Sequence, residues 1–316
     1  GIAAIDLLPN IKPTDWVVYE LSSFQLQDLH RSPHLSVVLG LSLDHQDHHK
    51  SPREYYEAKS NIVKYQTKTD AAIFNQDYPE TLAMSKGAPG QLFFTSRQTS
   101  VDQGAYVASG VLCRCLGQKK IERVLSVQEV ALKGDFNLEN VTAAVVAASL
   151  AGANLLAIRK VLKTFKGLAH RLEYIGEREG IEYWNNSAGS TPETTIVAIQ
   201  SFKQPIVLML GGSDKGHNYT ELGKAVAGST VKVVVGVGKM GPKMYEAIKK
   251  SFRGKSQKPP AYVEGGLTMP EMMTTARKFG KPGDIILLAP GAASFDRFKN
   301  YFDRGEQFRA EVLSRN

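Results

Sequence analysis

The segment Pro205–Gly216, PIVLMLGGSDKG, decides the fold of the second half of the chain. Its apolar run predicts a buried strand at 205–210, and the glycine-rich turn Gly211–Gly216 ends that strand. Backbone amides in such a turn favour anions, although a single turn of this kind is only a weak indication of a ligand. The segment therefore predicts a strand whose carboxyl end opens on a polar loop.

The same alternation of apolar runs and helical patterns continues on both sides of this segment. Further strands are predicted near 181–185, 231–236, 261–264 and 284–289. A second glycine turn, Pro290–Ser294, follows the last strand, and a final helix is predicted from about Ser294 to Leu313. Strands that alternate with helices form a parallel sheet covered by helices.

The first half is less regular. Strands are predicted near 16–20, 35–40 and 70–74, short antiparallel strands within 91–130, and helices at 52–66, 137–151 and 155–165. Gly167 marks a hinge between the halves. We therefore predict an α/β protein with two domains, residues 1–167 and 168–316, as a length of 316 residues favours.

Composition limits the class of protein. The chain is 42% hydrophobic and 22% charged, and no apolar run approaches the ~18 residues that span a membrane. Without a secretory signal pattern, a cytoplasmic protein with no membrane insertion is expected. The net charge of +8 is partly local, within 249–258, and indicates either a solvated loop and helix end or attraction to an anionic substrate such as a nucleotide. It does not favour a nucleic acid, because zinc-finger and RNA-recognition patterns are missing from the sequence.

Two predicted strand ends carry groups that could bind a cation. Glu20 ends the strand 16–20 within VYELSSFQL (18–26), and the carboxyl ends of strands are where ligands bind in open α/β sheets. The alternatives are a solvated acid or a helix cap from Ser22 or Ser23. The next strand is followed by DHQDHH (44–49), which includes His45. Carboxylates suit hard cations and imidazoles suit transition metals, whereas a loop of solvated histidines is the simpler alternative.

Other candidate residues lie on predicted helices. Lys59 falls fourteen residues after His45, and by itself a lysine on a helix indicates a surface charge. Asn137 and Asn140 are one turn apart and share a face, so their amides could bind the edge of a purine. Asn137 could instead cap the helix. A phosphate-binding G-x-x-x-x-G-K-[ST] loop does not occur in the sequence.

Taken in this order, the motifs resemble those of the Mur ligases, the ATP-dependent amide-forming enzymes of peptidoglycan precursor synthesis. The segments that carry the resemblance are ELSSFQL (20–26), DHQDHH (44–49), EYYEAKSNI (54–62), FNLEN (136–140), GLAHRLE (167–173), LGGSDKG (210–216) and APGAASFDRFKNYFDRG (289–305). ELSSFQL, and GGSDKG combined with ASFDRFKN, are fairly specific to the member that joins D-glutamate to UDP-N-acetylmuramoyl-L-alanine.

The resemblance implies a three-domain architecture, with a UDP-binding domain, a central ATPase domain and a C-terminal Rossmann-like domain. Residues 1–167 would be the later part of the ATPase domain, and residues 168–316 the whole C-terminal domain. The family's phosphate-binding loop would precede Gly1, which would explain why the chain opens with GIAAIDLL and no start methionine. Residues 1–316 alone are therefore expected not to turn over ATP. A monomer is expected.

The resemblance also assigns roles to residues. Glu20 and His45 would bind Mg²⁺. Lys59 would carry a CO₂-derived carbamate, which is an anion and could lie beside the same Mg²⁺. The residues that would contact the nucleotide are Asn137, Asn140, Arg171 and Asn186. The residues that would bind the acceptor amino acid are Ser190, Lys215, Ser294 and Tyr301. ATP would phosphorylate the substrate carboxylate, and the acceptor amine would attack the acyl phosphate.

Two departures from the family pattern leave alternatives open. The family usually has N-D-S-K-A-T-N where this chain has Asn185–Thr191, NNSAGST. Asn186 stands where an aspartate contacts the ribose, and Ala188 stands where a lysine helps to hold the acceptor. A ligase with another acceptor, folylpolyglutamate synthetase among them, and a non-catalytic binding module are the alternatives. ELSSFQL argues against folate.

Overall fold

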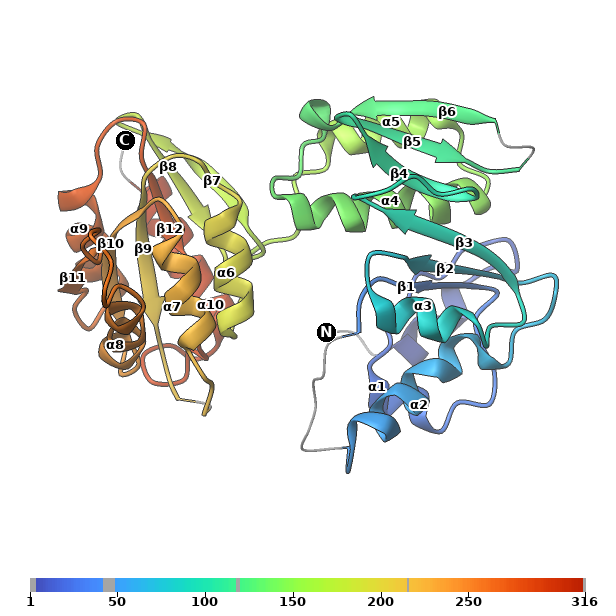
Figure 1. Cartoon of the computed structure of the whole chain (residues 1–316), viewed down its shortest axis with the longest axis horizontal. Coiled ribbons are helices and arrows are strands. Elements are labelled where there is room, and N and C mark those ends of the chain that lie inside the picture. Colours follow the sequence, from blue (N-terminus) through green and yellow to red (C-terminus); the bar gives the residue numbers. More distant parts are fainter. Residues whose placement is uncertain (1–3, 42–48, 118–119, 215, 315–316) are drawn as a thin grey trace. The chain divides into compact units, whose positions relative to one another are not determined.

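The computed structural model describes residues 4–41, 49–117, 120–214 and 216–314. Contacts within the chain divide it into two compact units (Figure 1). The first unit comprises Gly1–Val130 and Leu138–Lys163, and the second comprises Ala131–Asn137 and Thr164–Asn316. Each unit contains a six-stranded, mostly parallel sheet with helices against it, so the predicted α/β class is confirmed.

The sheet of the second unit has the order β11-β10-β9-β12-β8-β7. Its parallel strands are β8 (Ile181–Asn185), β9 (Ile206–Gly211), β10 (Val231–Val237), β11 (Ala261–Glu264) and β12 (Ile285–Leu288). All five lie within one residue of their predicted positions. The sequence did not predict β7 (Glu173–Arg178), which pairs antiparallel with β8. Its side chains are half-buried or exposed, so this edge strand lacks the apolar run that identifies the others.

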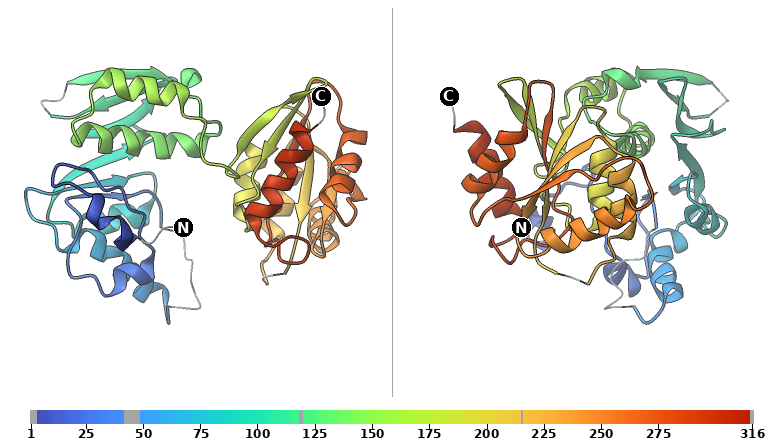
Figure 2. Two further views of the ribbon diagram at one scale, coloured as in Figure 1. Left: turned by 180° about the vertical axis from the view of Figure 1, so that it is seen from behind. Right: turned by 60° about the vertical axis from the view of Figure 1, so that its left-hand side comes forward.

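Helices cover both faces of this sheet (Figures 1 and 2). The helices α6 (Pro192–Gln200), α7 (Thr220–Ala227) and α8 (Gly241–Ser251) pack on the face that includes Ile206, Leu208 and Leu210. The helices α9 (Met269–Phe279) and α10 (Tyr301–Leu313) pack on the opposite face, with Val207 and Met209. Successive residues of β9 therefore enter opposite cores, as the two-residue repeat of a strand requires.

The last helix begins later than predicted. α10 starts at Tyr301, and its cap is Asn300, whose Oδ1 accepts a hydrogen bond from Asp303 N at 2.9 Å. Residues 294–300 form turns, because Ala293 is drawn into a bridge with Ser213. The prediction that this helix starts at Ser294 is wrong.

The sheet of the first unit follows chain order from β1 to β6. Its strands are β1 (Leu35–Val38), β2 (Ala71–Asn75), β3 (Gln91–Ser96), β4 (Gly104–Ala108), β5 (Val111–Cys115) and β6 (Ile121–Ser126). Strands β1 to β4 pair in parallel, and β4 to β6 pair antiparallel. The antiparallel prediction for 91–130 therefore fails for β3, which continues the parallel part of the sheet.

Among the described residues, the first unit contains two 3₁₀ helices, η1 (Ala4–Asn10) and η2 (Val127–Glu129), the whole of α1 (Ser23–Gln27), α2 (Pro52–Lys64) and α3 (Pro79–Ser85), and most of α4 (Asp135–Leu150) and α5 (Leu155–Thr164). Arg114 donates to Ser149 Oγ at 2.8 Å and Arg159 donates to Val124 O at 2.6 Å, which joins α4 to β5 and α5 to β6. Within the described ranges, the helices are too short or too polar to cross a membrane.

The predicted strand at 16–20 is not formed. This segment has no assigned secondary structure and no ladder partner among the described residues, where β1 pairs only with β2. The side chains of Trp16, Val17, Val18 and Tyr19 are between 53% and 97% exposed. An apolar run becomes a strand only when a neighbouring strand supplies hydrogen bonds, so the pattern alone was insufficient.

A polar cluster around Glu139 joins α4 to the carboxyl ends of β2 and β3. Glu139 accepts hydrogen bonds from Tyr78 at 2.8 Å, Asn75 at 3.2 Å and Arg97 at 2.7 Å. Burial, the hydrogen bond to Glu139 and the charge of that carboxylate raise the pKa of Tyr78 to about 12. Glu139 therefore fixes the first turns of α4, which carry Asn137 and Asn140.

Arg304 is a fully buried cation in the second unit. Its guanidinium donates to Ser187 Oγ at 2.9 Å, to Ser187 O at 2.8 Å and to Ala292 O at 3.2 Å. Burial lowers the pKa of Arg304 to about 10, so the side chain is still charged at neutral pH. The charge is compensated by oxygen atoms of two loops, which follow β8 and β12, and by the carboxylate of Asp296.

Replacing Arg304 should destabilise the second unit. Arg304→Met removes the three donors and leaves two buried carbonyl oxygens unpaired, which should cost about 3 kcal/mol of unfolding free energy. Urea unfolding followed by circular dichroism measures this change. Arg253→Met, at an exposed arginine of the same unit, is the control and should change stability by less than about 0.5 kcal/mol. Equal effects of the two substitutions would contradict the role of Arg304.

The Glu139 cluster should be visible in the titration of Tyr78. A tyrosine whose folded-state pKa exceeds 10.0 contributes stability below that pH, and this stability is lost as the pH rises through about 12. Glu139→Gln should lower the midpoint toward 10.0 without reaching it, because burial, the largest cause, remains. Nuclear magnetic resonance of ¹³Cζ-labelled tyrosine, assigned with Tyr78→Phe, measures the midpoint. An unchanged midpoint would show that Glu139 does not act on Tyr78.

Candidate functional site

Three loops meet at the carboxyl edge of the second sheet, where ligands bind in open α/β folds. They are residues 185–190 after β8, 211–216 after β9 and 289–294 after β12, and we call them the loop cluster. Backbone hydrogen bonds join them: Asn186 N donates to Leu288 O at 2.7 Å, Gly211 N to Pro290 O at 2.9 Å and Ser213 N to Ala293 O at 2.8 Å. The cluster is therefore fixed by backbone contacts.

Gly211, the last residue of β9, and Gly212, which follows it, are required by close backbone contacts. Gly211 and Gly212 have φ angles of 128° and 147°. A Cβ on Gly211 would lie 2.1 Å from Val237 O, and one on Gly212 would lie 2.1 Å from Ala293 O. Packing alone thus explains why the chain has two glycines here, and their presence does not by itself indicate an anion site.

Of the predicted acceptor residues, Ser190 and Ser294 lie in the loop cluster and Tyr301 lies beside it. Ser294 ends one of its loops and is 2% exposed. Tyr301 is half-exposed, and its carbonyl accepts a hydrogen bond from Ser187 Oγ at 2.7 Å. Ser190 is half-buried at the end of the first loop, and Lys215 lies outside the described residues. The structure therefore brings Tyr301 and the loop that contains Ser190 together through Ser187.

Arg171 is exposed between two residues with left-handed backbone conformations. The φ angles of His170 and Leu172 are 64° and 45°, an unusual conformation for residues other than glycine. Strained positions of this kind cluster at functional sites. The backbone around Arg171 is therefore shaped to present its side chain to solvent.

His170, which the sequence analysis did not single out, is buried and anchors this region. Its Nδ1 lies 2.9 Å from Asn185 Nδ2, and its backbone N donates to Glu173 Oε2 at 2.9 Å. Its ring packs edge-on against Phe302 at a centroid distance of 4.9 Å. Burial lowers the pKa of His170, which favours the neutral imidazole. The segment GLAHRLE contained this residue, but composition gave no sign that it would be buried.

Asn186 is buried, and both ends of its amide are bonded within the chain. Its Oδ1 accepts from Leu172 N at 3.0 Å, and its Nδ2 donates to Thr194 O at 3.3 Å. The side chain is 8% exposed. A contact between this amide and a ribose would have to compete with those two bonds.

In the first unit, Lys59 lies beside the ELSSFQL segment. Its Nζ donates to Leu21 O at 3.4 Å and is 5.9 Å from the centre of the Tyr55 ring. Buried His49 packs edge-on against Tyr55 and lies 2.8 Å from Ser23 Oγ through its Nε2. These contacts fix α1 against α2, so Lys59 approaches the residue next to Glu20.

The cation site predicted from sequence is only partly described. Glu20 is exposed, and His45 lies outside the described residues. Ser22 N donates to Gln25 Oε1 at 2.8 Å, so the helix-cap alternative holds for Ser22 and does not involve Glu20. Within the described ranges no three acidic, histidine or cysteine side chains form a group that could hold a metal ion. Glu20 offers carboxylate oxygens, and Lys59 would offer oxygens only as a carbamate.

The two asparagines of FNLEN lie in the first turns of α4. Asn137 is the third residue of α4, so it is not the residue that precedes and caps the helix. Its Nδ2 donates to Lys133 O at 2.7 Å. Asn140 is exposed one turn later.

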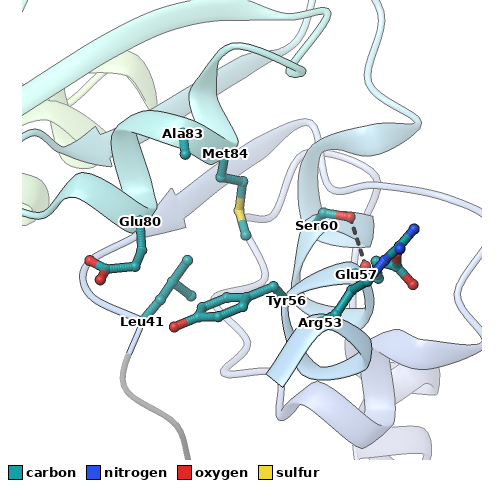
Figure 3. A pocket seen from close by; sticks show the side chains of 8 residues that line it. All are labelled: Leu41, Arg53, Tyr56, Glu57, Ser60, Glu80, Ala83 and Met84. Carbon is teal, nitrogen blue, oxygen red and sulfur yellow. Dashed lines mark hydrogen bonds and ion pairs between the residues drawn. The ribbon is translucent and has the colours of Figure 1, made fainter. Parts of the chain in front are cut away.

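A pocket of about 600 Å³ lies between α2 and α3 (Figure 3). Figure 3 shows the ring of Tyr56 directed toward Leu41, with Met84 above it. The other lining residues are Arg53, Glu57, Ser60, Ala83 and Glu80. The predicted site residues do not line it. Arg53 pairs with Glu57 at 2.7 Å, but both side chains are largely exposed, so the pocket lacks a buried polar group that would select a ligand.

Comparisons with known proteins identify relatives along nearly the whole chain. Residues 5–148 match the Mur ligase middle domain. UDP-N-acetylmuramoylalanine--D-glutamate ligase of Acetivibrio thermocellus is 35% identical over 314 residues, which are 99% of this chain and 67% of that protein. The enzyme of the same name from Acidobacterium capsulatum is 36% identical over 99% of this chain and 66% of its own length. The chain thus spans about two thirds of these relatives.

Solved structures show a similar fold at low sequence identity. The UDP-N-acetylmuramate-alanine ligase MurC of Thermotoga maritima has a TM-score of 0.63 and 16% identity, over 93% of this chain and 62% of that one. MurF of Acinetobacter baumannii has a TM-score of 0.62 and 18% identity, over 90% and 61%. The fold agrees with the sequence relatives, and on this basis the chain belongs to the Mur ligase family.

Proposed function

We propose that this chain is part of an ATP-dependent ligase that joins D-glutamate to UDP-N-acetylmuramoyl-L-alanine. The first unit would belong to the central ATPase domain, and the second would be the C-terminal Rossmann-like domain. The observation that carries the proposal is the hydrogen bond from Lys59 to Leu21 O, 3.4 Å long. This bond supports the proposal because it joins the lysine that the family resemblance makes functional to Leu21, the residue that follows Glu20 of ELSSFQL.

Lys59 would act as a carbamate. Its uncharged amine would attack CO₂, forming an N–C bond and releasing one proton, so a cation becomes an anion. The carbamate nitrogen keeps one hydrogen and can still donate to Leu21 O. Glu20, His45 and carbamylated Lys59 would together hold Mg²⁺, which supplies positive charge beside the phosphates of ATP.

The nucleotide would be bound by Asn137, Asn140 and Arg171. The asparagine amides offer a donor and an acceptor side by side, which suits the edge of adenine. Glu139 supports this role because it fixes the helix turn that carries both asparagines. The exposed guanidinium of Arg171 suits a phosphate or ribose oxygen. Asn186 accepts a hydrogen bond from Leu172, the residue after Arg171, and donates one to Thr194, so both ends of its amide already have partners.

The acceptor would bind at the loop cluster, near Ser190, Lys215, Ser294 and Tyr301. The reaction has two steps. ATP first transfers its γ-phosphoryl group to the alanine carboxylate, giving an acyl phosphate and ADP. The amine of the acceptor then attacks the acyl carbon, and phosphate leaves from a tetrahedral intermediate. The loop cluster would hold the acceptor so that its amine faces that carbon.

A ligase with a different acceptor is the second candidate, and Ala188 favours it. The methyl group of Ala188 supplies no charge where the family has a lysine. Arg297 and Lys299 are exposed near the last loop and are the cations that could compensate. If neither does, the acceptor should be less acidic than D-glutamate.

Lys59 should be needed for activity. In the complete gene product, Lys59→Ala should reduce formation of the UDP-linked product by at least about 100-fold, because the anionic group that faces the cation is lost. Liquid chromatography with mass spectrometry of the UDP-linked product measures the rate of its formation. Lys64→Ala, at an exposed lysine on the same helix, is the matched control and should retain activity. A ¹³C signal from labelled bicarbonate that is lost in Lys59→Ala but not in Lys64→Ala would identify the carbamate; an active Lys59→Ala enzyme would rule it out.

The acceptor assignment makes a separate prediction. Offered a panel of D- and L-amino acids with ATP, Mg²⁺ and UDP-N-acetylmuramoyl-L-alanine, the enzyme should yield the product mass of D-glutamate addition. Ala188→Lys should lower the KM for D-glutamate, by about tenfold for one added charged contact. Preference for a neutral or an L-amino acid would refute D-glutamate as the acceptor and leave the ligase proposal standing.

A further inference from the structure

The side chain of Asn186 joins two segments that flank the loop cluster. One is the backbone of Leu172, whose N–H donates to Asn186 Oδ1 at 3.0 Å, and the other is Thr194 O, which accepts from Asn186 Nδ2 at 3.3 Å. The backbone N of Asn186 is itself fixed by Leu288 O at 2.7 Å. The backbone carbonyl of Asn186 accepts from Gly189 N at 3.0 Å, so each polar group of this buried residue has a defined partner.

The bond to Leu172 stabilises an unfavourable conformation. Leu172 has a φ of 45°, in the left-handed region that costs free energy for a residue with a Cβ. His170, on the other side of Arg171, has a φ of 64° and is fixed by the bond from its N to Glu173 Oε2. The direction of the exposed Arg171 side chain therefore depends on two anchors, and Asn186 is one of them.

Gly189 provides the space that this arrangement needs. A Cβ on Gly189 would lie 2.8 Å from Asn186 Nδ2 and 2.7 Å from Thr194 Oγ1. An alanine there would push the amide away from Thr194. An aspartate at 186 could still accept from Leu172 N, but it would place a carboxylate oxygen against Thr194 O. The residue types at 186 and 189 are therefore matched to each other.

We propose that Asn186 is a positioning residue that acts through Arg171, and that it does not contact the nucleotide. This inference rests on the proposed nucleotide-binding role of Arg171. It explains why an asparagine with both amide groups bonded inside the protein stands at a position where the resemblance would put a ribose contact.

A double-mutant cycle on ADP binding tests the proposal. Isothermal titration with ADP and Mg²⁺ would compare the unmodified protein with Asn186→Ala, Arg171→Ala and the double variant. Each single substitution should raise the Kd for ADP about tenfold. The double variant should bind no more weakly than Arg171→Ala alone, because the effect of Asn186 passes through Arg171. A Kd raised by the product of both factors would show an independent contact and overturn the proposal.

Hydrogen exchange of the Leu172 amide, without nucleotide, gives a second measurement. It should be at least about tenfold faster in Asn186→Ala and in Gly189→Ala than in the unmodified protein. Asn154→Ala, which removes the bond from Ala157 N to Asn154 Oδ1, is the matched control and should change neither Leu172 exchange nor ADP binding. Unchanged exchange in Asn186→Ala would overturn the proposal.

The two measurements separate this inference from the proposed function. If the unmodified protein does not bind ADP, the nucleotide role fails, whereas the exchange of Leu172 still decides whether Asn186 anchors it. Should Asn186→Ala not fold, Gly189→Ala replaces it in both experiments, because its Cβ would displace the Asn186 amide from its partners without removing that side chain.

Discussion

The loop cluster depends on a buried positive charge. Arg304 reaches Ser187 and Ala292, residues more than a hundred positions apart in the chain, through three hydrogen bonds. Moving a guanidinium out of water is costly, so it is stable only where oxygen atoms surround it. The same bonds that compensate this charge hold the loops after β8 and β12 in one geometry. Residues of those loops, Ser294 among them, are therefore rigidly placed before any ligand binds.

The position of the cluster follows from the sheet. Parallel strands bring all their carboxyl ends to one edge, and β12 lies between β8 and β9, so the loops after these three strands become neighbours. At Gly211 and Gly212 the backbones approach so closely that a side chain would clash with a carbonyl oxygen. Close backbone packing and buried polar bonds thus complement each other, and the site needs both.

The sequence predicted those strands whose apolar residues are consecutive in the chain, and it failed where a partner distant in sequence decides the structure. Strands β8 to β12 were predicted because strands buried on both faces are continuous apolar segments. The run at Trp16–Tyr19 has the same appearance, yet it forms no strand, because strand formation needs a paired neighbour. Edge strand β7 and the late start of α10 were missed for a related reason. Both are set by tertiary contacts, the pairing with β8 and the bridge between Ser213 and Ala293.

In the candidate site, too, the sequence indicated which residues matter but did not reveal which partners they contact. The motifs drew attention to Lys59, Arg171 and the glycine turns, and the structure places Lys59 beside Leu21 O and the turns in one cluster. They did not reveal that His170 would be buried or that Glu139 would bind three side chains. Those roles depend on partners that are distant in sequence, which a local pattern does not contain.

The residue types at 186, 188 and 189 have different physical consequences. Asn186 and Gly189 touch the same small space beside Thr194, so a change at one restricts what the other can be. Ala188 is different: its backbone N donates to His170 O at 3.0 Å, a bond that any residue except proline could make, and its half-buried methyl group has no such coupling. The pair at 186 and 189 can therefore preserve the geometry around Arg171 while the residue type at 188 changes independently. Under the proposed roles of Arg171 and Ala188, nucleotide binding and acceptor choice would depend on different residues of the loop 185–190 and could diverge separately.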